Sequence, residues 1–358
     1  MEQQAKKIWI FDSTLRDGAQ GEEISFSVQD KLNIVQTLDQ LGIDYIEAGN
    51  PGSNPKDLEF FERVGQLTLH HAKLVAFGST RRKEEKVEDD INLQALLSAN
   101  TKVVSIFGKS WDFHVTDIIH TTLEENLRMI EETVAFLKVH GKEVIFDAEH
   151  FFDGYKRNPD YAMQTLLAAQ KGGADYICLC ETNGGAFPDE VSRIVAQVLP
   201  QLWVPVGIHT HDDGGMAVAS SVMAVLAGAQ MVQGTLIGFG ERCGNANLSA
   251  IIANLQLKRN YQCIPPENLH KLMQTCRVVS EISNVRLHKN MPYVGKSAFA
   301  HKGGMHIDGV NKAPASFEPI NPESVGNSRR FLMSEVAGRS TLIERIQKVD
   351  ASVRREDE

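Results

Sequence analysis

The chain has 358 residues, of which 46 are acidic and 37 basic, and its formal net charge is −9. Hydrophobic residues make up 42% and charged residues 23%, which is typical of globular proteins and excludes a disordered or collagen-like chain. The acidic balance argues against a nucleic-acid or anionic-membrane partner, because no global positive field attracts phosphates. No apolar run approaches the ~20 residues that span a bilayer.

The N-terminus and the cysteines predict a cytoplasmic protein. The first residues, MEQQAKKIWIFD, do not have the pattern of a signal peptide. The five cysteines are an odd number and include no CxxC pair, so a reducing compartment is expected rather than a disulfide framework. Cys178 and Cys180 lie two apart in an apolar run, and we interpret them as small buried hydrophobic residues.

Eight short apolar runs alternate with segments of helical pattern. The runs are mostly continuous, as in parallel strands covered on both faces. They are residues 8–15, 45–49, 74–78, 103–108, 143–151, 176–182, 204–211 and 231–240. Between the first two, Ser27 and Asp30 form a capping-box pattern and Gly42 stops the helix. Eight such units predict a closed (β/α)₈ TIM barrel over residues 1–260, with a doubly wound open sheet as the alternative.

The strand rhythm ends after about residue 255. Residues 266–283 have a helical pattern, and residues 290–330, rich in Gly, Pro and Asn, predict loop with short helices. A last helix is expected from Ser340 to about Val349. We therefore expect a C-terminal, mainly helical extension over residues 261–358.

Polar residues gather where the predicted strands end, which is where functional residues of such barrels sit. His209 and His211 lie two apart on the seventh strand and therefore point together into the barrel mouth. Closure of the barrel pairs the eighth strand with the first and brings Asp17 and Asn245 to neighbouring positions. A carboxylate, two imidazoles and an amide oxygen suit Mn²⁺, Co²⁺, Zn²⁺ or Mg²⁺. Two satisfied core histidines are the alternative.

Three further acidic and basic side chains are candidates at the same mouth. Arg16 could pair with Glu47 near the end of the second strand, or polarise a substrate carbonyl, and the two roles are compatible. Asp147 and Glu149 share one face of the fifth strand, where a carboxylate pair can share a proton and titrate abnormally. A solvated strand end is the alternative for this pair.

Two more groups stay open at this point. Asp212 and Asp213 are additional metal-ligand candidates, although one of them fits better as an orienting partner of a histidine or as a helix cap. The segment HKGGMH, residues 301–306, predicts a loop whose backbone approaches a neighbour closely. His301 and His306 are equally consistent with structural and functional roles.

The barrel region resembles the DRE-TIM metallolyases, a superfamily of metal-dependent acyl-transferase and lyase barrels, through FDSTLRDGAQGEE and HTHDDGGMAVASSVMAVLAGAQMVQGTLIGFGERCGNANL. The superfamily contains isopropylmalate, homocitrate and citramalate synthases and hydroxymethylglutaryl-CoA lyase. The likeness continues through NMPYVGKSAFAHKGGMHIDG, a stretch that the synthases have beyond the barrel. The AQGEEISFS continuation of the first motif favours the citramalate synthase branch.

The resemblance implies a homodimeric, divalent-metal-dependent acyltransferase. It would condense acetyl-CoA with pyruvate and hydrolyse the thioester, and the citramalate would feed isoleucine and thus branched-chain amino-acid biosynthesis. The implied metal ligands are Asp17, His209, His211 and Asn245.

The same resemblance assigns the remaining site residues. Arg16 would bind the 2-oxo acid and polarise its keto oxygen, and Thr182 would contact its carboxylate. We add Asp147, at the same mouth, as a third candidate for binding the substrate. Glu149 would help to deprotonate the acetyl methyl group or would hold the base that does. His306 matches a catalytic histidine that reaches the active site of the partner subunit.

Several alternatives remain open. A sister synthase would use 2-oxoisovalerate or 2-oxoglutarate, and a CoA-thioester lyase would use the same barrel. A metal-binding protein without catalysis fits less well, because it needs neither Arg16, Glu149 nor His306. Synthases of this group usually carry a further C-terminal regulatory domain, whereas this chain stops at Glu358, so no inhibition by amino acids is expected.

Overall fold

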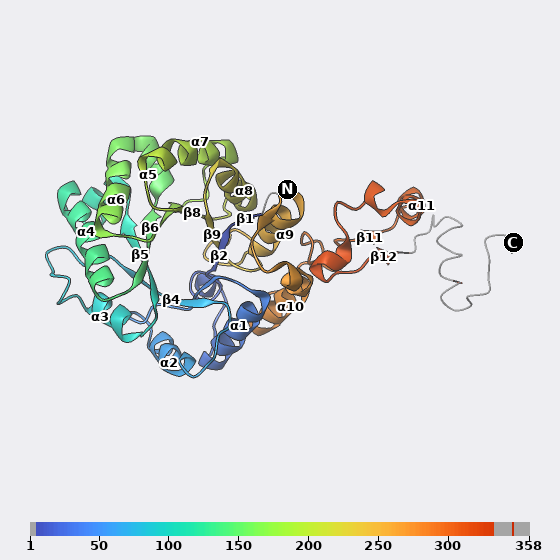
Figure 1. Ribbon diagram of the computed structural model, residues 1–358, viewed down its shortest axis with the longest axis horizontal. Coiled ribbons are helices and arrows are strands. Elements are labelled where there is room, and N and C mark those ends of the chain that lie inside the picture. The colour runs from blue at the N-terminus through green and yellow to red at the C-terminus, as the bar shows by residue number, and fades with distance from the viewer. Residues whose placement is uncertain (1–4, 333–345, 347–358) are drawn as a thin grey trace.

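The computed structural model describes residues 5–332 and residue 346. Eight parallel strands form a closed barrel in which each strand pairs with the next and β9 returns to β2. Helices surround the barrel (Figure 1), so the (β/α)₈ prediction is confirmed and the open sheet is excluded. The strands are β2 Trp9–Asp12, β3 Tyr45–Glu47, β4 Lys73–Ser79, β5 Val103–Lys109, β6 Glu143–Glu149, β7 Tyr176–Glu181, β8 Val206–Thr210 and β9 Met231–Gly234.

The surrounding helices begin and end where the sequence provides caps. Ser27 and Asp30 form the expected capping box of α1, and Gly42 ends that helix in the left-handed conformation with φ +94°. None of the helices in the described ranges has the length and apolar character of a membrane span. The helices are α1 Val28–Leu41, α2 Pro55–Val64, α3 Ile91–Ser98, α4 Leu123–Val139, α5 Phe151–Arg157, α6 Pro159–Gly172, α7 Pro188–Val198, α8 Ala217–Ala227 and α9 Leu248–Lys258.

The barrel interior changes from apolar to polar along its axis. Its lower layer is a separate apolar cluster of Phe11, Tyr45, Val75, Val103, Ile145 and Met231. Two residues further along several strands, at the next inward position, the buried side chains are polar. These are Glu47, Ser105, Asp147 and Gln233. The strands therefore close one end of the barrel with hydrophobic packing and present polar groups toward the other.

The eighth barrel strand is shorter than the sequence pattern predicts. The apolar run over residues 231–240 suggested one strand, but β9 ends at Gly234. The chain then folds back, with Asn245 N donating to the Gly238 carbonyl and Thr235 N donating to the Ala246 carbonyl. An isolated bridge joins His211 to Asn245. This return loop lies beside the end of β8.

The extension after α9 is partly helical and projects to one side of the barrel (Figure 1). It includes α10 Leu272–Ile282, α11 Gly304–Lys312 and the two-residue strands β11 Ala300–His301 and β12 Arg330–Phe331. Another short strand, β10 Tyr261–Gln262, pairs with β1 Lys6–Lys7 at the start of the chain. The predicted helix from residue 340 to 349 lies outside the described residues, except for residue 346.

Asp12, the last residue of β2, has a buried carboxyl group whose ionisation affects the stability of the barrel. Its carboxylate accepts hydrogen bonds from Thr14 N at 2.9 Å and Thr14 Oγ1 at 3.0 Å. Burial nevertheless raises its pKa from 3.8 to about 7. The folded state thus holds the proton more tightly than the unfolded state. The stability that this group contributes is complete below pH 4 and is lost as the pH rises toward 7.

The substitution Asp12→Asn removes the ionisable carboxyl group and therefore the loss of stability that accompanies its ionisation. We expect the free energy of unfolding of the metal-free variant, relative to wild type, to increase by up to about 4 kcal/mol between pH 4 and pH 8. Urea unfolding at five pH values measures it, with Asp89→Asn as the control for loss of an exposed charge. A difference that stays constant over this range contradicts the prediction.

Candidate active site

A cavity of about 210 Å³ opens at the carboxyl ends of the barrel strands. This is the end at which barrels of this type place their functional groups. Side chains from five strands, β4 to β8, and from the loops that follow β2, β7, β8 and β9 converge there. The lining residues are Arg16, Asp17, Gln20, Phe77, Phe107, Asp147, Glu149, Cys180, Thr182, His209, His211 and Glu241.

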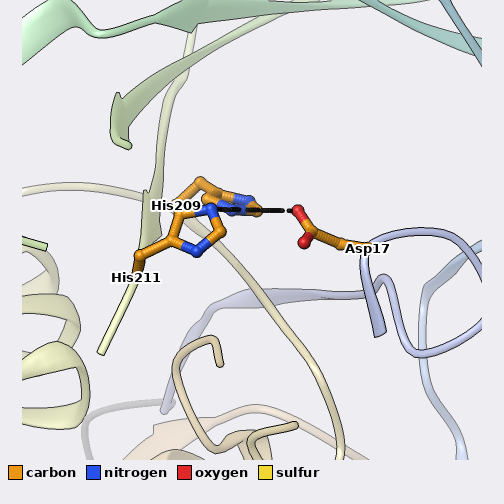
Figure 2. A group of neighbouring side chains, drawn as sticks. All are labelled: Asp17, His209 and His211. Carbon is orange, nitrogen blue, oxygen red and sulfur yellow. Dashed lines mark hydrogen bonds and ion pairs between the residues drawn. The ribbon is translucent and has the colours of Figure 1, made fainter. Parts of the chain in front are cut away.

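Asp17, His209 and His211 form a tight cluster at the floor of this cavity (Figure 2). Asp17 Oδ2 lies 3.5 Å from His209 Nε2 and 4.0 Å from His211 Nε2. The two Nε2 atoms lie 3.4 Å apart. Ligands at roughly 2.1 Å from one ion, at octahedral or tetrahedral angles, are separated by about 3.0–3.4 Å. The three atoms therefore need only a small contraction to share one ion.

The local chain positions these three side chains from two directions. The two-residue spacing along β8 turns both imidazoles inward, as the sequence predicted. Asp17 follows β2, and its backbone N–H donates to Ser13 Oγ at 3.2 Å. Pairing of β9 with β2 then holds these two parts of the chain against each other.

The electrostatics favour a carboxylate and neutral imidazoles. Burial lowers the pKa of His209, and it lowers the pKa of His211 to about 4 with His209 adding to the effect. Burial alone would raise the pKa of Asp17, but Arg16 and the two histidines outweigh it and the net pKa is lowered. Deprotonated ligands of this kind are what a divalent metal requires.

Buried polar atoms without partners also fit a metal here. Among the described residues, Asp17 Oδ1, His211 Nδ1 and Asn245 Oδ1 have no hydrogen-bond partner. Buried polar groups are rarely left in this state, because each costs free energy unless it is bound. The Asn245 amide lies against the cluster with its nitrogen 3.2 Å from His209 Nε2, so binding an ion through oxygen requires the amide to turn over.

Arg16 lies beside the cluster in a fixed orientation. Its Nε donates to Glu47 Oε2 at 2.7 Å and its Nη1 to Asp17 Oδ2 at 3.0 Å. Its guanidinium also stacks 3.8 Å above the Phe77 ring centroid. The ion pair with Glu47 that the sequence suggested is therefore present. The orientation leaves a fixed positive charge facing the cavity.

The two predicted carboxylates of β6 have separate partners. Asp147 accepts hydrogen bonds from Ser105 Oγ at 2.5 Å and Gln233 Nε2 at 2.8 Å, and burial raises its pKa to about 7. Glu149 forms an ion pair with Lys109. No bond joins the two carboxylates in the described structure, so the shared-proton interpretation is not supported.

The remaining candidates at the mouth divide between cavity and scaffold. Thr182 lines the cavity, and its Oγ1 accepts a hydrogen bond from His150 N at 2.9 Å. Asp212 Oδ1 accepts a hydrogen bond from Ala217 N, the first residue of α8, at 2.9 Å, although the N-cap residue itself is Met216. Asp213 pairs with Arg242 at 2.8 Å. Neither aspartate belongs to the histidine cluster.

The histidines of the extension lie elsewhere. His301 Nε2 lies 3.0 Å from Glu318 Oε1, which is a structural contact within the extension. His306 is an exposed residue of α11 and stacks on Phe317 with the ring centroids 4.5 Å apart. It does not line the cavity of its own chain. The helix that carries it projects away from the barrel (Figure 1).

Sequence reasoning missed several residues that shape the site, including Gln20 in the cavity lining. Phe77 and Phe107 form one wall, with stacked rings 5.5 Å apart. Ser105 and Gln233 lie below the cavity and bind Asp147. The available signal was a polar residue at an inward position of an apolar run, as in VVSIFG and MVQGT.

Known proteins resemble this chain over nearly its whole length. The HMGL-like family model matches residues 7–279, and a model described as homocitrate synthase post-HMGL domain-like matches residues 293–357. The HMG-CoA lyase of Bacillus subtilis has the same fold, with a TM-score of 0.67 and 19% identity over 81% of this chain and 98% of that one.

Curated relatives give higher identities. The (R)-citramalate synthase of Aquifex aeolicus is 56% identical over 96% of this chain and 65% of its own length. The (R)-citramalate synthase of Synechocystis sp. is 52% identical over 95% of this chain and 64% of its own length. A probable 2-isopropylmalate synthase of Methanopyrus kandleri is 35% identical over 98% of this chain and 67% of its own length. The chain thus spans about two thirds of the length of these relatives.

The ligand role of Asp17 can be tested directly. Asp17→Asn removes the carboxylate charge and is expected to weaken Mn²⁺ binding at least about tenfold, because the two imidazoles lose their anionic partner. Titration of the metal-free protein, followed by calorimetry or Mn²⁺ electron paramagnetic resonance, measures the affinity. Asp213→Asn at the same rim is the matched control and should bind like wild type. Equal affinities for Asp17→Asn and wild type would remove Asp17 from the ligand set.

Proposed function

This chain belongs to the HMGL-like family, and from its site we propose that it condenses acetyl-CoA with pyruvate to give citramalate and coenzyme A. The observation that carries the proposal is the cluster of Asp17, His209 and His211 with Arg16 beside it, at the floor of a small cavity. A divalent ion and a guanidinium side by side suit a substrate with adjacent carboxylate and keto oxygens.

The identities of the relatives support pyruvate as the 2-oxo acid. The relatives named (R)-citramalate synthase reach 56% identity, whereas the one named probable 2-isopropylmalate synthase reaches 35%. The prefix in that name supports the (R) product. Phe77 and Phe107 line the same cavity, and the Phe77 ring lies against the Arg16 guanidinium, so an apolar wall stands beside the charged group.

We assign the metal to Asp17, His209 and His211, with Asn245 as a further ligand. When bound there, the ion would act as a Lewis acid toward the keto oxygen of the 2-oxo acid. Arg16 would donate hydrogen bonds to the same oxygen as negative charge grows on it. Glu47 keeps this guanidinium in place, and its charge helps to raise the pKa of Arg16. Asp147 and the Thr182 hydroxyl would bind the substrate in the same cavity.

Glu149 is the side chain in the cavity that we assign to proton removal. The base takes a proton from the acetyl methyl group, and the resulting carbanion attacks the keto carbon to form the new carbon–carbon bond. The π electrons of the keto group move to its oxygen, which then takes up a proton to become the hydroxyl group of the product. Water then cleaves the thioester and releases coenzyme A. Lys109 holds the Glu149 carboxylate and fixes its direction. His306 would share the proton transfer with Glu149.

The position of His306 supports a shared site between two chains. The residue is exposed on α11, outside the cavity of its own chain. Met305 beside it is 85% exposed and Phe317 beneath it is 43% exposed, so this part of the extension presents apolar surface. We infer a homodimer in which α11 of one chain approaches the cavity of the partner subunit.

Thiol release tests the reaction. With Mn²⁺ and acetyl-CoA, we expect free coenzyme A to appear fastest with pyruvate and at least about tenfold more slowly with 2-oxoisovalerate and 2-oxoglutarate, because a pocket that selects a methyl group holds a larger side chain less well. A thiol-reactive dye measures the rate. The rate with 2-oxobutyrate, whose side chain is one methylene longer than that of pyruvate, should lie between these values. Removal of the metal with a chelator should abolish release. Preference for a branched or dicarboxylic substrate, or no release with any of them, contradicts the proposal.

Subunit mixing tests the shared site. Homodimers of Arg16→Ala and of His306→Ala should each have little activity, because each removes one part from every site. Mixed dimers should recover up to about a quarter of the wild-type rate, since half of the dimers are hybrids and each hybrid restores one of two sites. The rate after mixing, with subunit exchange shown by differently tagged chains, measures the recovery. Absence of recovery in exchanged dimers would sink the shared-site assignment.

A further inference from the structure

A continuous row of buried hydrogen bonds runs below the cavity. Ser105 Oγ donates to Asp147 Oδ2 at 2.5 Å, and Gln233 Nε2 donates to Asp147 Oδ1 at 2.8 Å. The other end of the same amide, Gln233 Oε1, lies 2.9 Å from His209 Nδ1. The row joins β5, β6, β9 and β8 across the interior, and Ser105 and Gln233 are completely buried.

The chemistry of the row determines the direction of each bond. An ionised Asp147 can only accept hydrogen bonds, so the end of the Gln233 amide that faces it is the donor, Nε2, as the structure has it. The end that faces His209 is therefore the oxygen, which can only accept. His209 Nδ1 must carry the proton that is donated to it. In a neutral imidazole the other nitrogen, Nε2, then has no proton and presents its lone pair to the cluster.

His211 has no comparable partner. Its Nδ1 is buried without a hydrogen-bond partner among the described residues. Of the two imidazoles in the cluster, His209 is thus the one whose orientation and tautomer are held by the surrounding side chains. If the Gln233 amide were reversed, its NH₂ group would face Nδ1 and favour a proton on Nε2, where an ion could not bind.

We propose that Gln233 is a positioning residue that keeps His209 in the Nδ1–H tautomer and so leaves Nε2 free to bind the divalent ion. Ser105 and Asp147 hold the amide in the required direction. The inference rests on the metal site proposed above, and it adds to that site a part that touches neither the ion nor the substrate.

Metal affinity tests the positioning role without relying on catalysis. Gln233→Leu keeps the approximate volume but removes both hydrogen bonds, and we expect Mn²⁺ binding to weaken about 10–100-fold. Gln170→Leu is the matched control, because Gln170 is also a buried glutamine that accepts a hydrogen bond, from Trp203 N at 2.8 Å, far from the row. It should bind Mn²⁺ as wild type does. A folded Gln233→Leu protein with wild-type affinity overturns the proposal.

Exchanging the carboxylate and the amide between positions 147 and 233 separates the effect of hydrogen bonding on metal binding from the effect of packing. Gln233→Glu alone places two carboxylates against each other and should impair both folding and metal binding. Adding Asp147→Asn restores the pattern, since the asparagine NH₂ donates to the new glutamate and the glutamate accepts from His209 Nδ1. The double variant should therefore bind Mn²⁺ at least about tenfold more tightly than Gln233→Glu. No gain over the single variant contradicts the proposed direction of the bonds.

The tautomer itself can be observed in the wild-type chain. Nitrogen-15 correlation spectra of the metal-free protein should show His209 with its proton on Nδ1, and its signal is assigned by comparison with a His209→Gln spectrum. A proton on Nε2 overturns the proposal even if every variant fails to fold. Absence of Mn²⁺ binding by wild type would contradict the proposed metal site, and the tautomer would still decide the role of Gln233.

Discussion

Closure of the parallel barrel is the constraint on which the site depends. Asp12 at the end of β2 pairs with Gly234 at the end of β9 and with Ile46 on β3. This double pairing brings the loop after β2, which carries Arg16 and Asp17, to the side of the barrel where β8 ends. The proposed carboxylate and imidazole ligands come from opposite ends of the barrel sequence, and they become neighbours only when the sheet closes.

The polar layer inside the barrel is stable because each charge has a specific partner. Arg16 is bound by Glu47 and Asp17, and Asp147 by a hydroxyl and an amide. Unpaired charges at these depths would cost several kcal/mol each. Burial still raises the pKa of Asp147 to about 7, so the partners offset only part of the penalty. The apolar layer beneath, which includes Phe11 and Tyr45, provides packing that this polar layer cannot.

One chain provides the proposed metal ligands and the substrate pocket but not every proposed catalytic group. Glu149 lies in the cavity, whereas His306 lies on a projecting helix. In the proposed dimer the barrel would therefore position the ion and the 2-oxo acid, and the extension of the partner subunit would complete the proton transfer. Such a division links activity to assembly, because a dissociated chain would have an incomplete site.

The sequence by itself determined the features that depend on local periodicity. Alternating apolar runs and helices predicted the barrel, two-residue spacing paired His209 with His211, and the rule of closure placed Asp17 near them. It overextended β9, because the residues after Gly234 are apolar yet fold back. Only the tertiary structure decided that Gln233 bonds to His209 and Asp147, and that Glu149 pairs with Lys109. These contacts depend on the register between strands far apart in sequence, which no local pattern contains.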